Sequence, residues 1–554
     1  MIDPPFAAST AEHIELVVLG LLVAVAALAV VARLVRVPYP ILLTIGGLAI
    51  GFVPGMPDIE LDPDIVLLVF LPPLLYAAAF FSNLRELRAH WRPISTLAIG
   101  LVAVTTVSVA AIAHYAIGLD WPVSFVLGAI VSPTDAVAPA TILRRLGVPR
   151  RVVTIVEGEN LTNDWTALVA YKFAVAAVVT GTFSLAKAGP EFILTGVGGV
   201  AIGVAGGLAI AAVRKRLDDP PTEITISLLT PYAVYLPAEE LGLSGVIAAV
   251  TVGVVLGWRA SELTTHTTRL QAYAVWEILQ FLLNAVLFIL IGLQMHLALD
   301  ALEGRDGGEL LGYAVLVSAI VIAVRIAWVF GLSVLDRRVR QEIAGPADGA
   351  GWKEVTLVAW SSMRGAVSLA AALAIPLQTD AGAAFPERDL ILFLTFSVII
   401  ATLVLQGLAF PLLIRALDLD DDTSDADEEL DARIEIAYAA LDRIEELSGE
   451  GWVPEDTIER VRNMYDYRRR RFSSRLDDHS PEGEFDYEAR AELYRRVMNE
   501  VIDAQRATLR RLRDGGEITD EVRRNVEHEL DLEQARLERS DAPPQASRSA
   551  TSSA

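Results

Sequence analysis

The sequence predicts an all-α polytopic membrane protein with about thirteen transmembrane helices, followed by a charged helical tail. Of the 554 residues, 53% are hydrophobic, which is too high a proportion for one soluble domain of this length. Apolar stretches of roughly 18 to 25 residues recur from Ile14 to about Leu413, and each can cross a hydrocarbon core ~30 Å thick. The hydrophobicity then stops, so we expect a transmembrane domain over residues 1–416 and a tail over residues 417–554.

The expected spans follow the apolar stretches in chain order. They cover residues 14–34, 40–53, 64–81, 95–117, 122–142, 152–178, 189–213, 222–237, 243–258, 273–298, 310–334, 355–377 and 389–414. The first stretch is longer than the apolar region of a signal peptide, and no small-residue cleavage site follows it before the next span. We therefore expect it to be a true first helix.

The basic residues of the connecting loops predict the orientation, because cytoplasmic loops are enriched in Lys and Arg. With thirteen spans, one set of loops carries nearly all of these residues, from Arg33 to Arg415. The opposite loops carry only Lys187, Arg305 and Arg388. This alternation predicts an N-terminus outside and a tail in the cytoplasm.

Two spans contain polar and helix-breaking residues at their centres. The fifth holds Ser132-Pro133-Thr134-Asp135, where the proline removes one helical hydrogen bond, and the twelfth holds Ser361-Ser362-Met363-Arg364-Gly365. Irregular backbone at this depth is tolerated where it lines a wet cavity, and paired broken helices mark the sites of inverted-repeat transporters. The pattern therefore predicts two broken, crossing helices and a transport function.

The tail is strongly acidic and helical in pattern. Residues 417–554 hold 37 acidic and 21 basic residues, and apolar positions such as Ile434, Ala437, Leu441 and Ile444 recur at helical spacing. We expect cytoplasmic helices and a disordered end over residues 543–554. A regulatory or dimer-contact role and a plain solvated spacer are both open.

Composition excludes several classes of function. The chain has no cysteine, its seven histidines form no HExxH motif, and its acidic balance argues against nucleic acid as a partner. A Gly-rich stretch in the seventh span superficially matches a dinucleotide fingerprint, but it lacks a βαβ context. We expect Gly199, Gly203 and Gly207 to serve helix packing, and we expect neither a cofactor nor an enzymatic activity.

The sixth span carries a concentration of polar residues that a lipid-facing helix would not tolerate. Glu159 with Asn163, and Asn160 with Asp164, are four residues apart and form a stripe on one side of the helix. Asp164 lies about 18 Å along the helix from its cytoplasmic end, near the middle of the membrane. An ionisable residue at that depth indicates a functional site.

Charges of both signs converge at this depth, since Asp135, Arg325 and Arg364 lie at the same level of their spans. A buried Arg needs a carboxylate partner, so Arg364 with Glu159, or Arg325 with Asp135, are candidate pairs. Asp164 is then left unpaired. Desolvation disfavours its ionised form, so it can hold a proton and a hard cation in turn.

Oxygen ligands suit an alkali cation. Carboxylate, hydroxyl and amide oxygens are supplied by Asp164, Thr134 and Asn160, which we take as the expected Na⁺ ligands, with Ser132 beside them in the break.

Five motifs occur in order along the chain. They are Leu71-Pro72-Pro73-Leu74-Leu75-Tyr76, Ser132-Pro133-Thr134-Asp135, Glu159-Asn160-Leu161-Thr162-Asn163-Asp164, Leu290-Ile291-Gly292-Leu293 and Arg364-Gly365-Ala366-Val367-Ser368-Leu369. Over residues 13 to 416 the chain resembles the sodium/proton exchangers of the monovalent cation/proton antiporter-1 family. Two positions depart from the pattern of many relatives, which carry Glu where this chain has Ala77 and Ser where it has Asn160.

The resemblance implies a homodimer in the cytoplasmic membrane whose core moves against a dimerisation domain. It implies exchange of Na⁺ or Li⁺ for H⁺, electroneutral because Asn163 precedes Asp164, in the service of pH and sodium homeostasis. Asp164 would be the carrier, Asn163 its support, Thr134 and Asp135 would sit at the crossover, and Glu159 would pair with Arg364.

Three alternatives stay open beside this expectation. A K⁺/H⁺ antiporter would use the same oxygen ligands. An intramembrane aspartyl protease built on Asp135 and Asp164 would need a Gly-x-Gly-Asp motif, and no Gly-Asp dipeptide occurs in the chain. A passive cation channel would need a continuous pore, whereas paired broken helices favour alternating access.

Overall fold

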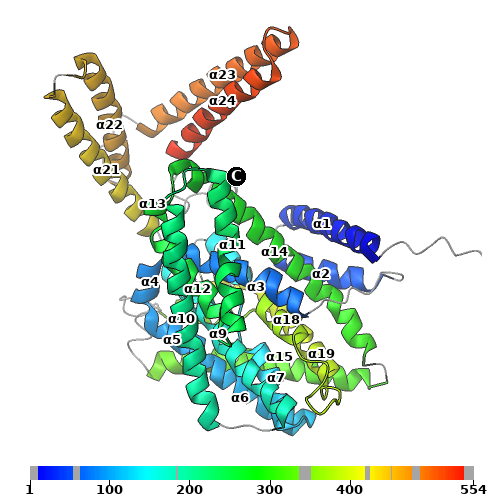
Figure 1. Cartoon of the computed structure of the whole chain (residues 1–554). Helices are drawn as coiled ribbons and strands as arrows, with labels where there is room; N and C mark the ends of the chain where they lie inside the picture. Colours follow the sequence, from blue (N-terminus) through cyan, green and yellow to red (C-terminus); the bar gives the residue numbers. More distant parts are fainter. Residues whose placement is uncertain are drawn as a thin grey trace, which may run out of the picture. The chain divides into compact units, whose positions relative to one another are not determined.

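The computed structural model describes residues 10–35, 37–53, 63–135, 137–146, 148–181, 185–302, 304–335, 351–417, 424–450, 452–476 and 487–541. The chain divides into two compact units, Met1–Leu419 and Asp420–Ala554. Figure 1 follows both along the chain by colour.

The first unit consists of helices, many of them apolar along their whole length. It begins with α1 (Thr10–Val35), α2 (Tyr39–Gly51), α3 (Pro63–Phe80), α4 (Leu84–Ala89), α5 (Trp91–Ser95) and α6 (Val102–Ile112). It continues with α7 (Trp121–Val131), α8 (Val137–Arg145), α9 (Arg150–Thr180), α10 (Leu185–Arg214), α11 (Pro220–Glu240), α12 (Gly245–Trp258) and α13 (Ala260–Leu263). It ends with α14 (His266–Asp300), α15 (Gly307–Leu335), α17 (Trp352–Trp360), α18 (Ala366–Leu373), α19 (Arg388–Ala401) and α20 (Gly407–Leu417).

Every span expected from the sequence coincides with a helix, a helix pair or a continuous helical run. The α5–α6 region is one run over Trp91–Ile117 and the α19–α20 region is another over Arg388–Leu417, both joined by π-helical turns. Among the described residues, five helices are long and apolar enough to cross a membrane on their own. Shorter apolar helices, among them α2, α7 and α12, accompany them. The expectation of an all-helical, polytopic membrane fold is confirmed.

Both expected breaks are present. Helix α7 ends at Val131 and α8 begins at Val137, while α17 ends at Trp360 and α18 begins at Ala366. Pro133 has no backbone N–H to continue α7, and Gly365 adopts an extended conformation with φ −157° just before α18. Each span is therefore two short helices joined by an irregular linker.

Small residues let the helices of this unit approach one another closely. A Cβ atom on Gly47 of α2 would lie 2.1 Å from the Ile289 carbonyl oxygen of α14. On α10, a Cβ atom on Gly203 would lie 2.5 Å from the Thr251 Cβ of α12. The packing role expected for the glycines of the seventh span is thus confirmed.

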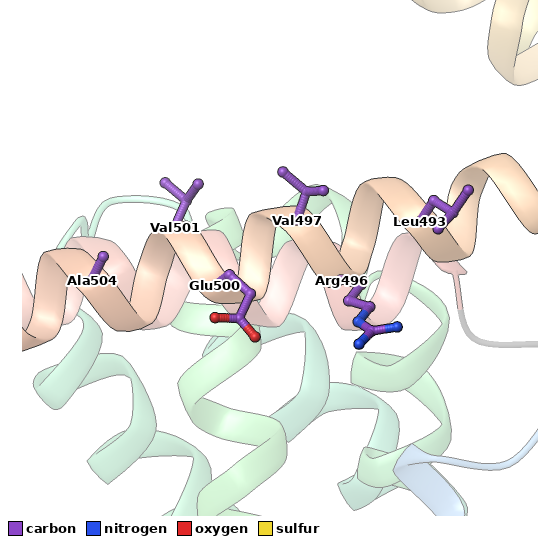
Figure 2. A pocket seen from close by; sticks show the side chains of 6 residues that line it. All are labelled: Leu493, Arg496, Val497, Glu500, Val501 and Ala504. Atoms are coloured by element: carbon purple, nitrogen blue, oxygen red, sulfur yellow. The ribbon is translucent and has the colours of Figure 1, made fainter.

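The second unit consists of two helical hairpins, α21 (Ser424–Ser448) with α22 (Glu455–Leu476) and α23 (Tyr487–Asp514) with α24 (Asp520–Asp541). Ile502 and Leu509 of α23 are buried, as is Leu530 of α24. Figure 2 shows that Leu493, Val497 and Val501 form a second, exposed apolar stripe on α23. The helices expected in the tail are therefore present, and the expected disordered end, residues 543–554, lies outside the described residues.

Candidate functional site

The two broken spans meet at their irregular linkers. The backbone N–H of Asp135 donates a hydrogen bond of 2.8 Å to the carbonyl oxygen of Met363. A Cβ atom on Gly365 would lie 2.8 Å from the Cβ of Asp135, so only a glycine permits this approach. The linkers therefore cross in direct contact.

Arg364 lies against the carboxyl ends of two half-helices and is 1% exposed. Its Nε donates to the carbonyl oxygen of Val131, the last residue of α7, at 3.1 Å, and its Nη1 donates to the carbonyl of Ser362 just after α17. Carbonyl groups at helix ends carry partial negative charge, which a cation stabilises. The guanidinium group thus holds the break together through backbone groups.

Asp135 has the opposite role at the start of α8. One of its carboxylate oxygens accepts a hydrogen bond of 3.3 Å from the backbone N–H of Ala138. A carboxylate at a helix N-terminus satisfies a free N–H group and complements the helix dipole. Asp135 and Arg364 therefore compensate opposite helix ends, as expected for residues that support a broken helix.

The buried ion pair of the site joins Glu159 to Arg325. Nη1 and Nη2 of Arg325 lie 2.5 and 2.8 Å from the two oxygens of Glu159, and Nη2 also donates to the carbonyl of Val358 at 2.9 Å. Arg325 is 0% exposed and Glu159 is 1% exposed. The geometry is the planar, bidentate arrangement that Arg makes with carboxylates.

Both pairings considered from the sequence are therefore wrong. Glu159 was expected opposite Arg364, and Arg325 opposite Asp135, because the four residues lie at one depth. Depth does not determine the side of a helix on which a residue lies. Arg364 is engaged by backbone carbonyls, which leaves Glu159 to Arg325 of α15.

A short chain of hydrogen bonds links this pair to the first break. The Thr134 hydroxyl donates to Glu159 Oε1 at 3.0 Å and accepts from Nδ2 of Asn163 at 2.8 Å. Asn163 Nδ2 also lies 3.3 Å from the carbonyl oxygen of Thr134. Asn163 is fully buried, and its two hydrogen bonds hold the first linker in place. Ser132 donates to the carbonyl oxygen of Ala129 at 2.9 Å, at the end of α7.

Asp164 follows Asn163 in α9 and is 3% exposed. It forms no ion pair among the described residues, and its Oδ1 is buried without a hydrogen-bond partner there. It borders a cavity of about 10 Å³, which is room for roughly one water molecule. The cavity is lined by Pro133, Thr134, Asp135, Asn160, Asp164, Gly365, Val367 and Ser368.

The structure thus sorts the expected site residues into two groups. Thr134, Asp135, Asn160 and Asp164 line the cavity. The others, Ser132, Glu159, Asn163, Arg325 and Arg364, hold the surrounding backbone and side chains without lining it. The sequence placed Ser368 in the last of the five motifs, Arg364 to Leu369, but did not single it out as a site residue.

Comparison with known proteins bears on what this site does. A family model for the transmembrane region of sodium/hydrogen exchangers matches residues 20–416. The chain belongs to the sodium/hydrogen exchanger family. Membership confirms the resemblance noted from the motifs and makes the protein a multi-pass membrane transporter rather than an enzyme.

This exchanger is similar to proteins of several bacteria. It is 37% identical over 525 residues to an uncharacterized Na(+)/H(+) exchanger of Mycobacterium tuberculosis, covering 94% of this chain and 96% of the relative. It is 34% identical over 419 residues to the Na(+)/H(+) antiporter ApNhaP of Aphanothece halophytica, covering 74% and 76% of the two chains.

A solved structure shares the fold of this exchanger. The sodium proton antiporter MjNhaP1 from Methanocaldococcus jannaschii superposes with a TM-score of 0.60 at 18% identity. The match covers 74% of this chain and 98% of that chain.

Proposed function

We propose that this exchanger moves Na⁺ or Li⁺ against H⁺ across the cytoplasmic membrane by alternating access, with Asp164 binding cation and proton in turn. The observation that carries the proposal is the place of Asp164. It is a buried carboxylate without an ion pair among the described residues, beside a cavity of about 10 Å³ where two broken helices cross. Sodium and pH homeostasis is the corresponding physiological role.

The chemistry of the lining residues supports this assignment. Carboxylate, amide and hydroxyl oxygens are hard ligands and suit an alkali cation. A bare carboxylate is disfavoured in a desolvated site, so Asp164 is occupied either by a cation or by a proton. Glu159 and Asp135 are already engaged, by Arg325 and by the start of α8.

One available negative charge supports a one-for-one exchange. If Asp164 alone changes occupant, each cation carried in one direction is replaced by one proton carried in the other. No net charge then crosses the membrane, so the exchange is electroneutral.

The proposed topology has thirteen spans, with the N-terminus outside and residues 417–554 in the cytoplasm. The bias of Lys and Arg toward one set of loops supports it. Two broken spans, α7–α8 and α17–α18, support inverted repeats, and the family resemblance supports a homodimer.

K⁺ is the second candidate for the transported cation. A relative from Bacillus pumilus, 34% identical over 430 residues and covering 74% of this chain, is named a sodium, potassium, lithium and rubidium/H(+) antiporter. The cavity has room for roughly one water molecule, which is about the size of a K⁺ ion, so its volume does not separate K⁺ from Na⁺ and Li⁺. Membership of an exchanger family leaves neither the intramembrane protease nor the passive channel as a competing proposal.

Proteoliposomes containing a trapped pH dye test the proposal. Addition of Na⁺ or Li⁺ should change internal pH with the wild type, and Asp164→Asn should abolish the response while the protein still elutes as a folded species. Asp300→Asn is the matched control, because Asp300 is more than half exposed at the end of α14. A full response from Asp164→Asn would remove Asp164 from the mechanism, and a response mainly to K⁺ would favour the second candidate.

A further inference from the structure

Ser368 is a buried hydroxyl that the exchange mechanism described so far does not use. It lies in the first turn of α18, directly after the second break, and is 1% exposed. Its Oγ has no hydrogen-bond partner among the described residues. A buried hydroxyl in that condition is costly, and each such group in a folded protein calls for an explanation.

Position separates Ser368 from the other buried hydroxyls without partners. Five residues share its condition but lie outside the cavity: Tyr76, Thr105, Thr106, Tyr171 and Thr395. Among the residues that line the cavity, three carry a buried oxygen without a partner in the described structure. They are Asp164, Asn160 and Ser368.

These three oxygens are of types that bind alkali cations: one carboxylate, one amide carbonyl and one hydroxyl. Asn160 and Asp164 come from α9, and Ser368 comes from α18. Each has oxygen lone pairs that no described protein donor uses. A cation in the cavity would satisfy all three at once.

Thr134, the hydroxyl expected from the sequence to bind the cation, is committed elsewhere. It gives its proton to Glu159 and accepts from Asn163, which leaves one lone pair of its oxygen. Ser368 Oγ has both lone pairs and its proton available in the described structure.

We infer that Ser368 is a cation ligand of this exchanger, contributed by the second broken helix opposite the Asn160 and Asp164 pair. The inference rests on the proposed function, since it concerns the cation that exchanges with a proton at Asp164. A hydroxyl serves both halves of such a cycle. It offers a lone pair to the cation and accepts a hydrogen bond from the carboxyl group when Asp164 is protonated.

Transport kinetics of Ser368→Ala provide the first test. Loss of one oxygen ligand should raise the KM for Na⁺ and for Li⁺ about tenfold, with a smaller effect on the maximal rate. Thr395→Val is the matched control, because it removes a buried hydroxyl without a described partner from α19, outside the cavity. A KM for Ser368→Ala equal to that of Thr395→Val and the wild type would overturn the inference.

Thiol labelling gives a second test that does not depend on transport rate. The protein has no cysteine, so Ser368→Cys introduces a single thiol of nearly the same size as the hydroxyl. Na⁺ should slow its reaction with a small water-soluble thiol reagent, and adding Asp164→Asn should remove that protection. Labelling that ignores Na⁺, or a thiol that never reacts, would contradict a ligand role.

The two tests separate the inference from the proposed function. A wild type that moves no protons in response to Na⁺, Li⁺ or K⁺ refutes the function itself. A wild type that exchanges normally, with Asp164→Asn inactive and Ser368→Ala unchanged in KM, refutes only the role of Ser368.

Discussion

Replacement of Arg325 by Met should destabilise the first unit, Met1–Leu419, more than the loss of an exposed ion pair at its surface does. Met has a side chain of similar length but no charge. The substitution therefore removes both hydrogen bonds to Glu159, at 2.5 and 2.8 Å, and those to the Val358 carbonyl oxygen. Glu159 is 1% exposed, so its carboxylate would lose its ion-pair partner while it stays buried.

The size of the effect follows from this burial. Removing one partner of a buried ion pair costs about 3–5 kcal/mol, because the other charge stays buried and uncompensated. Thr134 would still donate to Glu159, which favours the lower part of that range. By contrast, the pair of Arg305 and Glu387 is 43% and 39% exposed, and such surface pairs contribute at most about 1 kcal/mol.

Thermal unfolding in detergent, followed by the fluorescence of the nine tryptophans, measures the difference. We expect Arg325→Met to lower the apparent Tm by at least about 5 °C and Arg305→Gln to lower it by no more than about 2 °C. The double variant Glu159→Gln/Arg325→Met should recover part of the loss, since it removes the stranded charge. A double variant no more stable than Arg325→Met would refute the argument that the uncompensated carboxylate is the source of the cost.

Two further predictions follow from the crossing and from the cavity. Gly365→Ala should cost about 1–3 kcal/mol and reduce exchange, because its Cβ would lie 2.8 Å from the Cβ of Asp135. Gly312→Ala on α15, where a Cβ meets no atom within 4 Å, should leave exchange unchanged and should not lower Tm, since Ala favours a helix more than Gly does. Equal behaviour of the two variants would argue against a tight crossing. If cation and proton compete for Asp164, as proposed, the KM for Na⁺ should rise as pH falls, by up to about tenfold per pH unit. The KM can be measured in proteoliposomes with equal pH on both sides, over about pH 6 to pH 9. A KM that stays constant over this range would exclude direct competition between Na⁺ and H⁺.

The features that the sequence predicts well are local ones. Span length depends only on a run of apolar residues, and the breaks depend on Pro133 and on the polar Ser361–Gly365 segment. Each can be recognised without knowing what the helix packs against. The depth of Asp164, counted along a single helix, stays a prediction.

Side-chain pairing is not a local property, and the sequence did not predict which Arg pairs with Glu159. Whether Glu159 meets Arg325 or Arg364 depends on the rotation of α9 relative to α15 and to the second break, which no spacing within one helix reveals. Only the contacts show that Arg364 is occupied by the carbonyls of Val131 and Ser362.

Ser368 was missed for a related reason. A hydroxyl in an apolar helix commonly donates to the carbonyl four residues earlier, as Thr44 does to Pro40 at 2.9 Å and Thr230 does to Ile226 at 2.7 Å. Ser368 belongs to the motif from Arg364 to Leu369, but the motif does not reveal whether its hydroxyl has a partner. Its difference appears only when the cavity and the missing partner are seen together.

The hydrogen bond between Asp135 and Met363 joins segments that are far apart in the chain, and it fastens the two broken spans to each other at the site. In the proposed alternating-access cycle, a site tied together in this way would keep its ligands when it is presented to either side of the membrane. Its affinity for the cation should then be nearly the same inside and outside. The exchanger would then work at similar cation concentrations in either direction, whichever way the two ion gradients drive it.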